Sequence, residues 1–246
     1  MRNEKANVHN LGHTRAAICR DHYLQTPDTF IRAPLPGMKA ATAIVHAGPA
    51  TGARFTEYTA EMQASGTLGP THLQRFIYVL TGSIAIDDQE LNSGDYAYIP
   101  QDASHHVVAR SESNVAVMEK EFLPGPGMPQ FFTGSESKIA PQPLMGDPAL
   151  QVRALVPDSP EFDFAVNTMT FEPGAALSLV EMHVMEHGLL MLEGGGIYRL
   201  GDCWYPVSAG DFIYMAPFCP QWFGALGKSP TKYLIYKDWN RHPAAR

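Results

Sequence analysis

One short stretch, VEMHVMEHGLLMLE (180–193), contains the side chains of this sequence that are best suited to chemistry. Glu181, His183 and His187 offer one carboxylate and two imidazoles, which are ligand types for divalent transition metals. A single histidine among apolar residues is more often a packed, hydrogen-bonded residue than a ligand. The residues alone therefore leave two interpretations open, a metal site or a buried element of ordinary composition.

The same stretch allows a third interpretation, because residues 183–187 read HxxEH, the inverted zincin motif. That motif requires a helix, and residues 175–187 contain neither proline nor glycine. A run of three glycines follows at 194–196, and a related stretch earlier in the chain is interrupted by Gly69 and Pro70. Both features disfavour a helix.

The elements that must position these side chains are predicted to be β-strands. Short apolar segments alternate with turn-forming residues, including 21 glycines and 20 prolines, which is typical of strands and turns rather than of long helices. The predicted strand segments are 76–86, 95–100, 105–109, 115–122, 164–171, 188–200, 211–216 and 232–239. The sequence therefore indicates an all-β protein.

An internal repeat divides these strands into two sets. FIYVLTGSIAI (76–86) resembles LLMLEGGGIYRL (189–200), and SGDYAYIP (93–100) resembles AGDFIYMA (209–216). Each copy is a strand pair with a glycine turn, followed by a Gly-Asp turn into another strand. The repeat therefore predicts two copies of one β domain. Each copy is suited to a double-sheet jelly roll, which protects its sheet edges.

The repeat predicts the domain organisation. We expect an N-terminal barrel over residues 1–125 and a C-terminal barrel over residues 150–246. Residues 126–149 are predicted to be a linker, because their prolines and glycines disfavour continuous helix and sheet. Phe131 and Phe132 indicate that part of this linker packs.

Both motifs of the repeat resemble those of the cupins. In that superfamily the first motif supplies two histidines and a glutamate, and the second supplies a histidine eleven residues after a glycine. Glu181, His183 and His187 fall on the three ligand positions of the first motif. Gln221 takes the fourth position, eleven residues after Gly210. The resemblance implies a bicupin of two tandem double-sheet jelly-roll barrels, with these four side chains as metal ligands in the second barrel.

The chemistry of this ligand set is consistent with a reactive metal. One carboxylate, two imidazoles and one amide oxygen form a mixed nitrogen and oxygen site, which suits Mn²⁺, with Fe²⁺ or Zn²⁺ as alternatives. Four protein ligands leave about two octahedral positions free for a substrate or water. Residues 181 and 183 are predicted to share one face of a strand.

The first repeat is predicted to bind no metal. His105 keeps one ligand type in position, but the other places read Gly69, Thr71 and Arg75, or Gln74 if the alignment slips by one residue. The guanidinium of Arg75 would repel a cation. We expect the first barrel to pack against the second and shape its entrance. His105 and His106 are candidates for contact with a ligand.

The whole chain resembles the (S)-ureidoglycine aminohydrolase family of bicupins. The shared blocks are TPDTFIRAPLPG, EMHVMEHG, GIYRL, GDFIYMAPFCPQWFG and YLIYKDWNR, and the resemblance covers nearly the full length. It implies a Mn²⁺ enzyme of allantoin degradation that releases the amino group of (S)-ureidoglycine as ammonia and leaves (S)-ureidoglycolate.

The same resemblance implies which residues surround the substrate. Tyr198, Tyr233 and Lys237 match polar positions that the family places at its active site, and all three are expected to bind substrate. Tyr233 and Lys237 share strand parity, so both can face the barrel interior and transfer protons there. The alternative is a half-exposed strand with an ordinary lysine and tyrosine.

Two other classes of function stay open on the sequence. One is a metal-dependent cupin dioxygenase or isomerase that acts on another small polar metabolite. The other is a non-catalytic bicupin that binds a small molecule. Ammonia release distinguishes the hydrolase, because a dioxygenase would consume O₂ and a binding protein would turn nothing over.

Net charge, the N-terminal residues and the cysteines bear on which partners and which cellular compartment are expected. With 18 basic and 25 acidic side chains the net charge is −7, which disfavours nucleic acid and anionic membranes as partners. MRNEKANVHN (1–10) lacks the apolar core of a signal peptide, and no apolar run approaches the roughly 20 residues that span a bilayer. Cys19, Cys203 and Cys219 form no CxxC pair, which indicates neither a disulfide framework nor a thiolate zinc site and fits a reducing cytoplasm. A small-molecule substrate is expected, and the resemblance implies a homo-oligomer.

Overall fold

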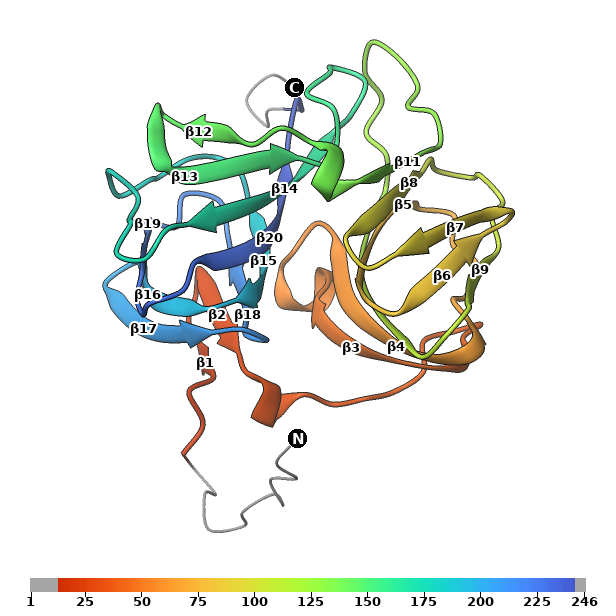
Figure 1. Cartoon of the computed structure of the whole chain (residues 1–246), viewed down its shortest axis with the longest axis horizontal. Helices are drawn as coiled ribbons and strands as arrows, with labels where there is room; N and C mark the ends of the chain where they lie inside the picture. Colours follow the sequence, from red (N-terminus) through yellow and green to blue (C-terminus); the bar gives the residue numbers. More distant parts are fainter. Residues whose placement is uncertain (1–12, 242–246) are drawn as a thin grey trace.

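The computed structural model describes residues 13–241, which form two lobes of antiparallel strands lying side by side (Figure 1). The predicted all-β class is confirmed. The helices of the described part are short 3₁₀ turns, η2 (Pro27–Thr29), η3 (Pro49–Thr51) and η4 (Glu136–Lys138). No helix of the described residues is long and apolar enough to cross a membrane. The expectation about a signal peptide concerns residues 1–10, which lie outside the described residues, as do residues 242–246 of the predicted C-terminal barrel.

The N-terminal lobe is one curled sheet of nine strands. In sheet order β11, β8, β5, β10, β4, β9, β6 and β7 are neighbours, and β3 pairs with β4. The strands are β3 (Lys39–Ala47), β4 (Thr56–Thr67), β5 (Gln74–Thr81), β6 (Ser83–Ile86), β7 (Gln89–Asn92), β8 (Asp95–Ile99), β9 (Val107–Ala109), β10 (Ser113–Lys120) and β11 (Phe132–Ser135).

The C-terminal lobe contains two sheets. The larger has eight strands in the order β1, β2, β18, β15, β20, β14, β13 and β12, and the smaller has the order β17, β16 and β19. The strands are β1 (Ala17–Ile18), β2 (His22–Gln25), β12 (Gln142–Leu144), β13 (Asp147–Ala154), β14 (Phe164–Phe171), β15 (His187–Glu193), β16 (Gly195–Leu200), β17 (Cys203–Ser208), β18 (Phe212–Met215), β19 (Gln221–Ala225) and β20 (Thr231–Asp238).

The glycines that define the repeat turn the chain at matching places. Gly82 separates β5 from β6 with φ of 79°, and Gly194 separates β15 from β16 with φ of 68°. Gly94 and Gly210, which precede β8 and β18, have φ of 84° and 92°. These left-handed values favour glycine, which explains why the motifs keep it. Each of the eight predicted strand segments contains a strand. The two longest segments contain two strands each, β5 with β6 and β15 with β16, and the two strands of each segment pair with other partners rather than with each other.

The N-terminal part of the chain crosses into the other lobe. β2 pairs with β18, with Tyr23 opposite Tyr214, whereas the predicted boundary assigned residues 1–125 to the N-terminal barrel. β11, from the predicted linker, pairs with β8, and β12 pairs with β13 in the C-terminal sheet. Residues 126–149 therefore extend both sheets as well as connecting them.

Alternate residues of the central strands face two different cores. In β20, Tyr233 and Ile235 pack inside the C-terminal lobe, while Leu234 and Tyr236 pack in a core shared with the N-terminal lobe. β10 alternates in the same way between the inside of its own lobe and this shared core. A period of two along each strand therefore builds both the lobes and the contact between them.

The shared core is largely aromatic. Phe55 of the N-terminal lobe stacks on Tyr236 with ring centroids 3.9 Å apart. Its aromatic members are Tyr23, Phe55, Phe76, Tyr78, Tyr96, Tyr98, Phe162, Phe164, Phe212, Tyr214 and Tyr236. Because each aromatic side chain buries about 150–250 Å², this surface holds the two lobes together.

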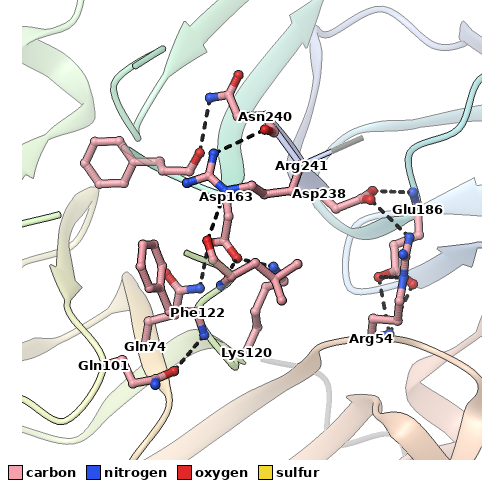
Figure 2. Close-up of polar contacts among 12 residues, drawn as sticks. Arg54, Gln74, Gln101, Lys120, Phe122, Asp163, Glu186, Asp238, Asn240 and Arg241 are labelled. Carbon is pink, nitrogen blue, oxygen red and sulfur yellow. Dashed lines mark hydrogen bonds and ion pairs between the residues drawn. The ribbon is translucent and has the colours of Figure 1, made fainter. Parts of the chain in front are cut away.

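A buried carboxylate adds polar contacts between the lobes (Figure 2). Asp163, fully buried before β14, accepts hydrogen bonds from Gln74 Nε2 at 2.7 Å and from the backbone N–H of Leu123 at 2.9 Å. It also forms an ion pair with Lys120 of β10. The charge is therefore paired and hydrogen-bonded, as a buried carboxylate must be.

A second buried carboxyl group, at the contact between the lobes, has no such partners. Glu57 of β4 is 0% exposed, and neither carboxyl oxygen has a hydrogen-bond partner among the described residues. It packs against Gly188 of β15, where an added Cβ would lie 2.1 Å from Glu57 Oε2. Burial raises the pKa of Glu57 well above its ordinary value, so the folded protein holds a neutral acid here.

We predict that Glu57→Gln removes a pH-dependent loss of folding stability. Above the ordinary pKa of 4.5 the unfolded chain releases this proton while the folded chain retains it, so wild-type stability falls as pH rises toward the folded pKa. The stability advantage of the variant should grow by up to about 1.4 kcal/mol per pH unit in that window and be flat below it. Urea unfolding of both proteins between acid and neutral pH measures this, and superposable pH profiles would contradict it.

Candidate metal centre

All of the predicted site residues line one cavity in the C-terminal lobe. Its volume is about 410 Å³, within the usual range for small-molecule sites. The predicted residues in its lining are Glu181, His183, His187, Tyr198, Gln221, Tyr233 and Lys237. They come from the segment before β15 and from β15, β16, β19 and β20, so the fold brings together side chains that are far apart in the sequence.

The segment before β15 is irregular. Its strand-like features are two isolated bridges to β19, Ala176 with Gly224 and Glu181 with Gln221. In the second, the backbone N–H groups of Glu181 and Gln221 each donate to the other's carbonyl oxygen, at 2.8 and 2.9 Å. The N–H of Phe218 donates to the His183 carbonyl oxygen at 2.7 Å. This backbone excludes the helix that the inverted zincin motif requires. It also differs from the predicted regular strand through residues 181 and 183.

Glu186, the glutamate of the HxxEH pattern, is bound toward the other lobe (Figure 2). Its carboxylate accepts hydrogen bonds from the backbone N–H of Arg54 at 3.2 Å and from Tyr214 Oη at 3.3 Å. Its own backbone N–H donates to Asp238 at 2.7 Å. These contacts hold the segment between the two histidines in place, and the N-terminal lobe contributes through Arg54.

His187 is buried at the start of β15 with a defined ring orientation. Its Nδ1 lies 3.1 Å from the carbonyl oxygen of Tyr236. Because a carbonyl can only accept, Nδ1 carries the hydrogen and Nε2 has a free lone pair. Burial and the neighbouring His183 lower the pKa of His187 to about 3, so the ring is neutral. A neutral imidazole whose second nitrogen is held by a carbonyl is the usual form of a metal ligand.

His183 and Gln221 converge on the same point. The Nε2 atoms of the two histidines are 3.3 Å apart, and the Gln221 side-chain amide lies 2.9 Å from His183 Nε2. Nitrogens that bind one ion at about 2.1 Å are about 3.0–3.4 Å apart at octahedral to tetrahedral angles. A half-turn of the Gln221 amide presents its oxygen to this point. The residues therefore fit a divalent cation.

Glu181 lines the cavity but is less tightly grouped. Its carboxylate oxygens and the ring nitrogens of His183 and His187 do not form one of the groups, found among the described residues, whose three ligand atoms all lie within 4.8 Å of one another. Burial raises the pKa of Tyr198 and Tyr233, and the Glu181 charge adds to that shift. Burial lowers the pKa of Lys237, and the Glu181 charge opposes that shift. The structure thus brings three of the four predicted ligands into contact and places the fourth in the same cavity.

The predicted substrate residues differ in character. Tyr198 and Tyr233 are each 2% exposed, and burial raises the pKa of both phenols, which therefore stay protonated. Lys237 lies opposite His187 in the strand register, and its ammonium sits 4.3 Å from the Trp239 ring centroid. Burial lowers the pKa of Lys237, although Asp158 and Glu181 oppose the shift.

Trp239 and Met185 are among the cavity residues that were not predicted. Trp239 faces the Lys237 ammonium, and Met185 lines the wall next to the histidines. Trp239 follows Lys237 by two residues, so strand parity provided a signal for it. Met185 belongs to the irregular segment, where no periodic pattern applies.

In the N-terminal lobe, the candidate residues have structural contacts. His105 Nδ1 lies 2.6 Å from Asp87, and its ring stacks on Phe131. Arg75 pairs with Glu119 at 2.6 Å. The guanidinium expected to repel a cation is therefore held by its own carboxylate, and the absence of a metal from this lobe stays a prediction.

Comparison with known proteins gives the class and then the family. A cupin domain model matches residues 167–236, and with the curled antiparallel sheets this makes the protein a cupin. The (S)-ureidoglycine aminohydrolase of Arabidopsis thaliana is 41% identical over 94% of this chain and 80% of its own length. A relative from Oryza sativa subsp. japonica, named for the same activity, is 42% identical over 94% of this chain and 77% of its own length. The crystal structure of protein Ylba from E. coli superposes with a TM-score of 0.82 at 27% identity, covering 96% of this chain and 98% of that one. The chain belongs to the (S)-ureidoglycine aminohydrolase family.

We predict that His183→Ala and His187→Ala each weaken Mn²⁺ binding by about 100-fold or more. Loss of a residue that only hydrogen-bonds to a metal ligand typically costs about 10–100-fold in affinity, and loss of the ligand itself should cost more. Isothermal titration of the metal-free protein with Mn²⁺ measures this. His105→Ala, a histidine variant in the other lobe, serves as the control and should titrate like wild type. Unchanged affinity in both His183→Ala and His187→Ala would contradict the assignment.

Proposed function

We propose that the protein converts (S)-ureidoglycine and water to (S)-ureidoglycolate and ammonia, in allantoin degradation and with Mn²⁺ as its metal. The observation that carries this proposal is the convergence of His183, His187 and Gln221 at one point of a cavity that Glu181 and Lys237 also line. Relatives at 41–42% identity that bear the name of this activity support it.

The four proposed ligands define what a bound cation would contribute. His183, His187, Gln221 and Glu181 would hold it, and when bound it supplies a positive charge and Lewis acidity beside the substrate. Two neutral nitrogens, an amide oxygen and one carboxylate suit a hard or borderline cation such as Mn²⁺. The other lining residues would bind and orient the substrate beside the cation.

Lys237 and the two buried tyrosines are proposed to bind and orient the substrate. The substrate carries a carboxylate, an amine and a ureido nitrogen on one carbon. The Lys237 ammonium offers a charge partner within the cavity, and the neutral phenols of Tyr198 and Tyr233 can donate hydrogen bonds to oxygen atoms. Three fixed contacts to one carbon are enough to select one enantiomer.

The proposed reaction needs one proton delivered and one removed. The Lys237 ammonium gives a proton to the leaving amine, and the carbon–nitrogen bond breaks as the lone pair of the ureido nitrogen forms a carbon–nitrogen double bond. Ammonia departs, and water adds to the same carbon while its proton returns to the Lys237 amine. The ureido nitrogen recovers its lone pair, so atoms and charge balance. Tyr233, which faces the same interior, is proposed to assist these transfers.

Assembly and location follow the family resemblance. We propose a cytoplasmic homo-oligomer, supported by the free thiols of Cys19 and Cys203 on the surface and by exposed apolar side chains beside the cavity, among them Met182 and Phe218. Light scattering on the purified protein should give a mass above one chain, and a monomer would contradict the oligomer.

The activity is tested by ammonia release from (S)-ureidoglycine with added Mn²⁺. Wild type should release ammonia without consuming O₂, and Gln221→Ala should reduce the rate by orders of magnitude. Oxygen consumption without ammonia would favour the dioxygenase alternative, and no turnover would favour a binding protein. Unchanged turnover in Gln221→Ala would remove that residue from the ligand set.

Lys237 variants separate charge from proton transfer. Lys237→Arg keeps the positive charge but cannot readily release a proton, so KM should stay near the wild-type value while kcat falls by about 100-fold or more. Lys237→Met should lower kcat and raise KM. Lys228→Met, in an exposed turn of the same lobe, is the control. Wild-type kcat in Lys237→Arg would contradict the proton-transfer role.

A further inference from the structure

The three cysteines of the chain gather around one histidine in the C-terminal lobe, outside the cavity described above. Cys19, His22 and Cys203 each offer a ligand atom, and these atoms lie within 4.8 Å of one another. Asp21, His22 and Cys219 form a second group that shares the histidine. Because the sequence has no CxxC pair, it contained no indication of a thiolate site. The fold nevertheless brings these cysteines together from distant segments.

Two hairpins hold the first group. The backbone N–H of Cys19 donates to the carbonyl oxygen of His22 at 2.9 Å, which closes the turn between β1 and β2. Cys203 begins β17, directly after the turn at Gly201, where φ is 56°. The side chains of Cys19 and Cys203 are exposed, so an ion can reach them, whereas His22 is only 3% exposed.

The hydrogen bonds of His22 direct one ring nitrogen toward the cysteines. Nδ1 lies 2.8 Å from a carboxylate oxygen of Asp21, which can only accept when ionised, so Nδ1 carries the hydrogen. Nε2 therefore carries the lone pair, which accepts a hydrogen bond from Tyr205. It lies 2.9 Å from Tyr205 Oη, and this oxygen is also 3.5 Å from Cys19 Sγ. A carboxylate behind a histidine is the arrangement that orients imidazole ligands in metal sites.

We propose that Cys19 Sγ, Cys203 Sγ and His22 Nε2 bind a thiophilic divalent cation of the zinc class. Binding releases one proton from each thiol, and the two thiolates neutralise the charge of the dication. The neutral imidazole is the third ligand, and water completes a tetrahedral shell. Tyr205 then donates its hydrogen bond to the Cys19 thiolate in place of the imidazole.

Binding requires the ligand atoms to draw together and the Tyr205 hydroxyl, which lies 2.9 Å from His22 Nε2 and 3.5 Å from Cys19 Sγ, to move aside. Ligand atoms around one tetrahedral zinc ion are about 3.4–3.8 Å apart, so the three atoms must approach by about 1 Å. Rotation of two exposed cysteine side chains allows this. The second group is less suited, because the Nδ1 that faces it already donates to Asp21 and Cys219 is buried, with Sγ 4.0 Å from that nitrogen.

The site would have a structural role. It would join the N-terminal hairpin of β1 and β2 to the hairpin of β16 and β17, two parts of one lobe that are separated by most of the chain. A cross-link between such distant segments stabilises the folded state. The inference is independent of the proposed activity, because no residue of the cavity takes part.

Titration of the reduced, metal-free full chain with Co²⁺ tests the proposal. Co²⁺ bound by thiolates has charge-transfer bands in the near ultraviolet, which a site without thiolates lacks. Tetrahedral Co²⁺ also has strong visible bands. Wild type should show both at one equivalent, and Zn²⁺ should abolish them by displacement. Zn²⁺ should also raise the melting temperature.

Single variants identify the ligands. In the His183→Ala background, which weakens binding at the candidate metal centre, Cys19→Ser and Cys203→Ser should lose the charge-transfer bands and the stabilisation by Zn²⁺. Cys219→Ser and His183→Ala should keep both, and the second variant separates this site from the candidate metal centre. Absence of charge-transfer bands in wild type would overturn the proposal. Bands that survive in Cys203→Ser and disappear in Cys219→Ser would overturn the assigned ligands in favour of the second group.

Discussion

The hydrogen bond from His187 Nδ1 to the Tyr236 carbonyl oxygen is the constraint on which the candidate metal centre depends. It fixes the tautomer, with the hydrogen on Nδ1, and turns Nε2 toward His183, 3.3 Å away. Burial lowers the pKa of His187 and keeps this ring neutral. The acceptor belongs to the backbone of β20, so its position is set by the register in which Gly188 pairs with Tyr236. Sheet register therefore determines ligand chemistry, because a shift of one residue would move Lys237 and Tyr233 to the opposite face.

β20 links the site to the rest of the molecule. Its odd-numbered residues Tyr233 and Lys237 line the cavity, while the side chain of Tyr236 stacks on Phe55 in the core shared by the lobes. The N-terminal lobe reaches the site a second time through Arg54, which holds Glu186 between the two histidines. This gives the first lobe a positioning role that follows from its contacts, and its own histidine His105 has only local partners.

Strand periodicity and repeated glycine turns were sufficient to predict the all-β class and eight segments that contain strands. The predicted strands were those with apolar runs, whereas the twelve-residue β4 was not predicted because its sequence, TEYTAEMQASGT, alternates small and polar residues. The pairing of β2 with β18 was not predictable either, since four residues carry too little pattern to define a partner. His187 and Gln221 line one cavity because motif spacing places them at the first residues of β15 and β19.

Sequence reasoning was weaker where the backbone is irregular or the partners are distant. The segment containing Glu181 and His183 has no periodicity, so strand parity gave the wrong local structure there, and the bridge to Gln221 decides its path instead. The cysteines around His22 come from both ends of the chain, and local spacing contains no information about such a cluster. In both cases tertiary contacts, rather than local pattern, place the side chains.

Pulsed electron paramagnetic resonance of bound Mn²⁺ tests the central claim most directly, because it detects the nitrogen atoms coordinated to the ion. The account predicts two imidazole nitrogens coupled to one Mn²⁺ per chain, reduced to one in His183→Ala and in His187→Ala. A Mn²⁺ spectrum without nitrogen coupling, or couplings unchanged in both variants, would contradict it.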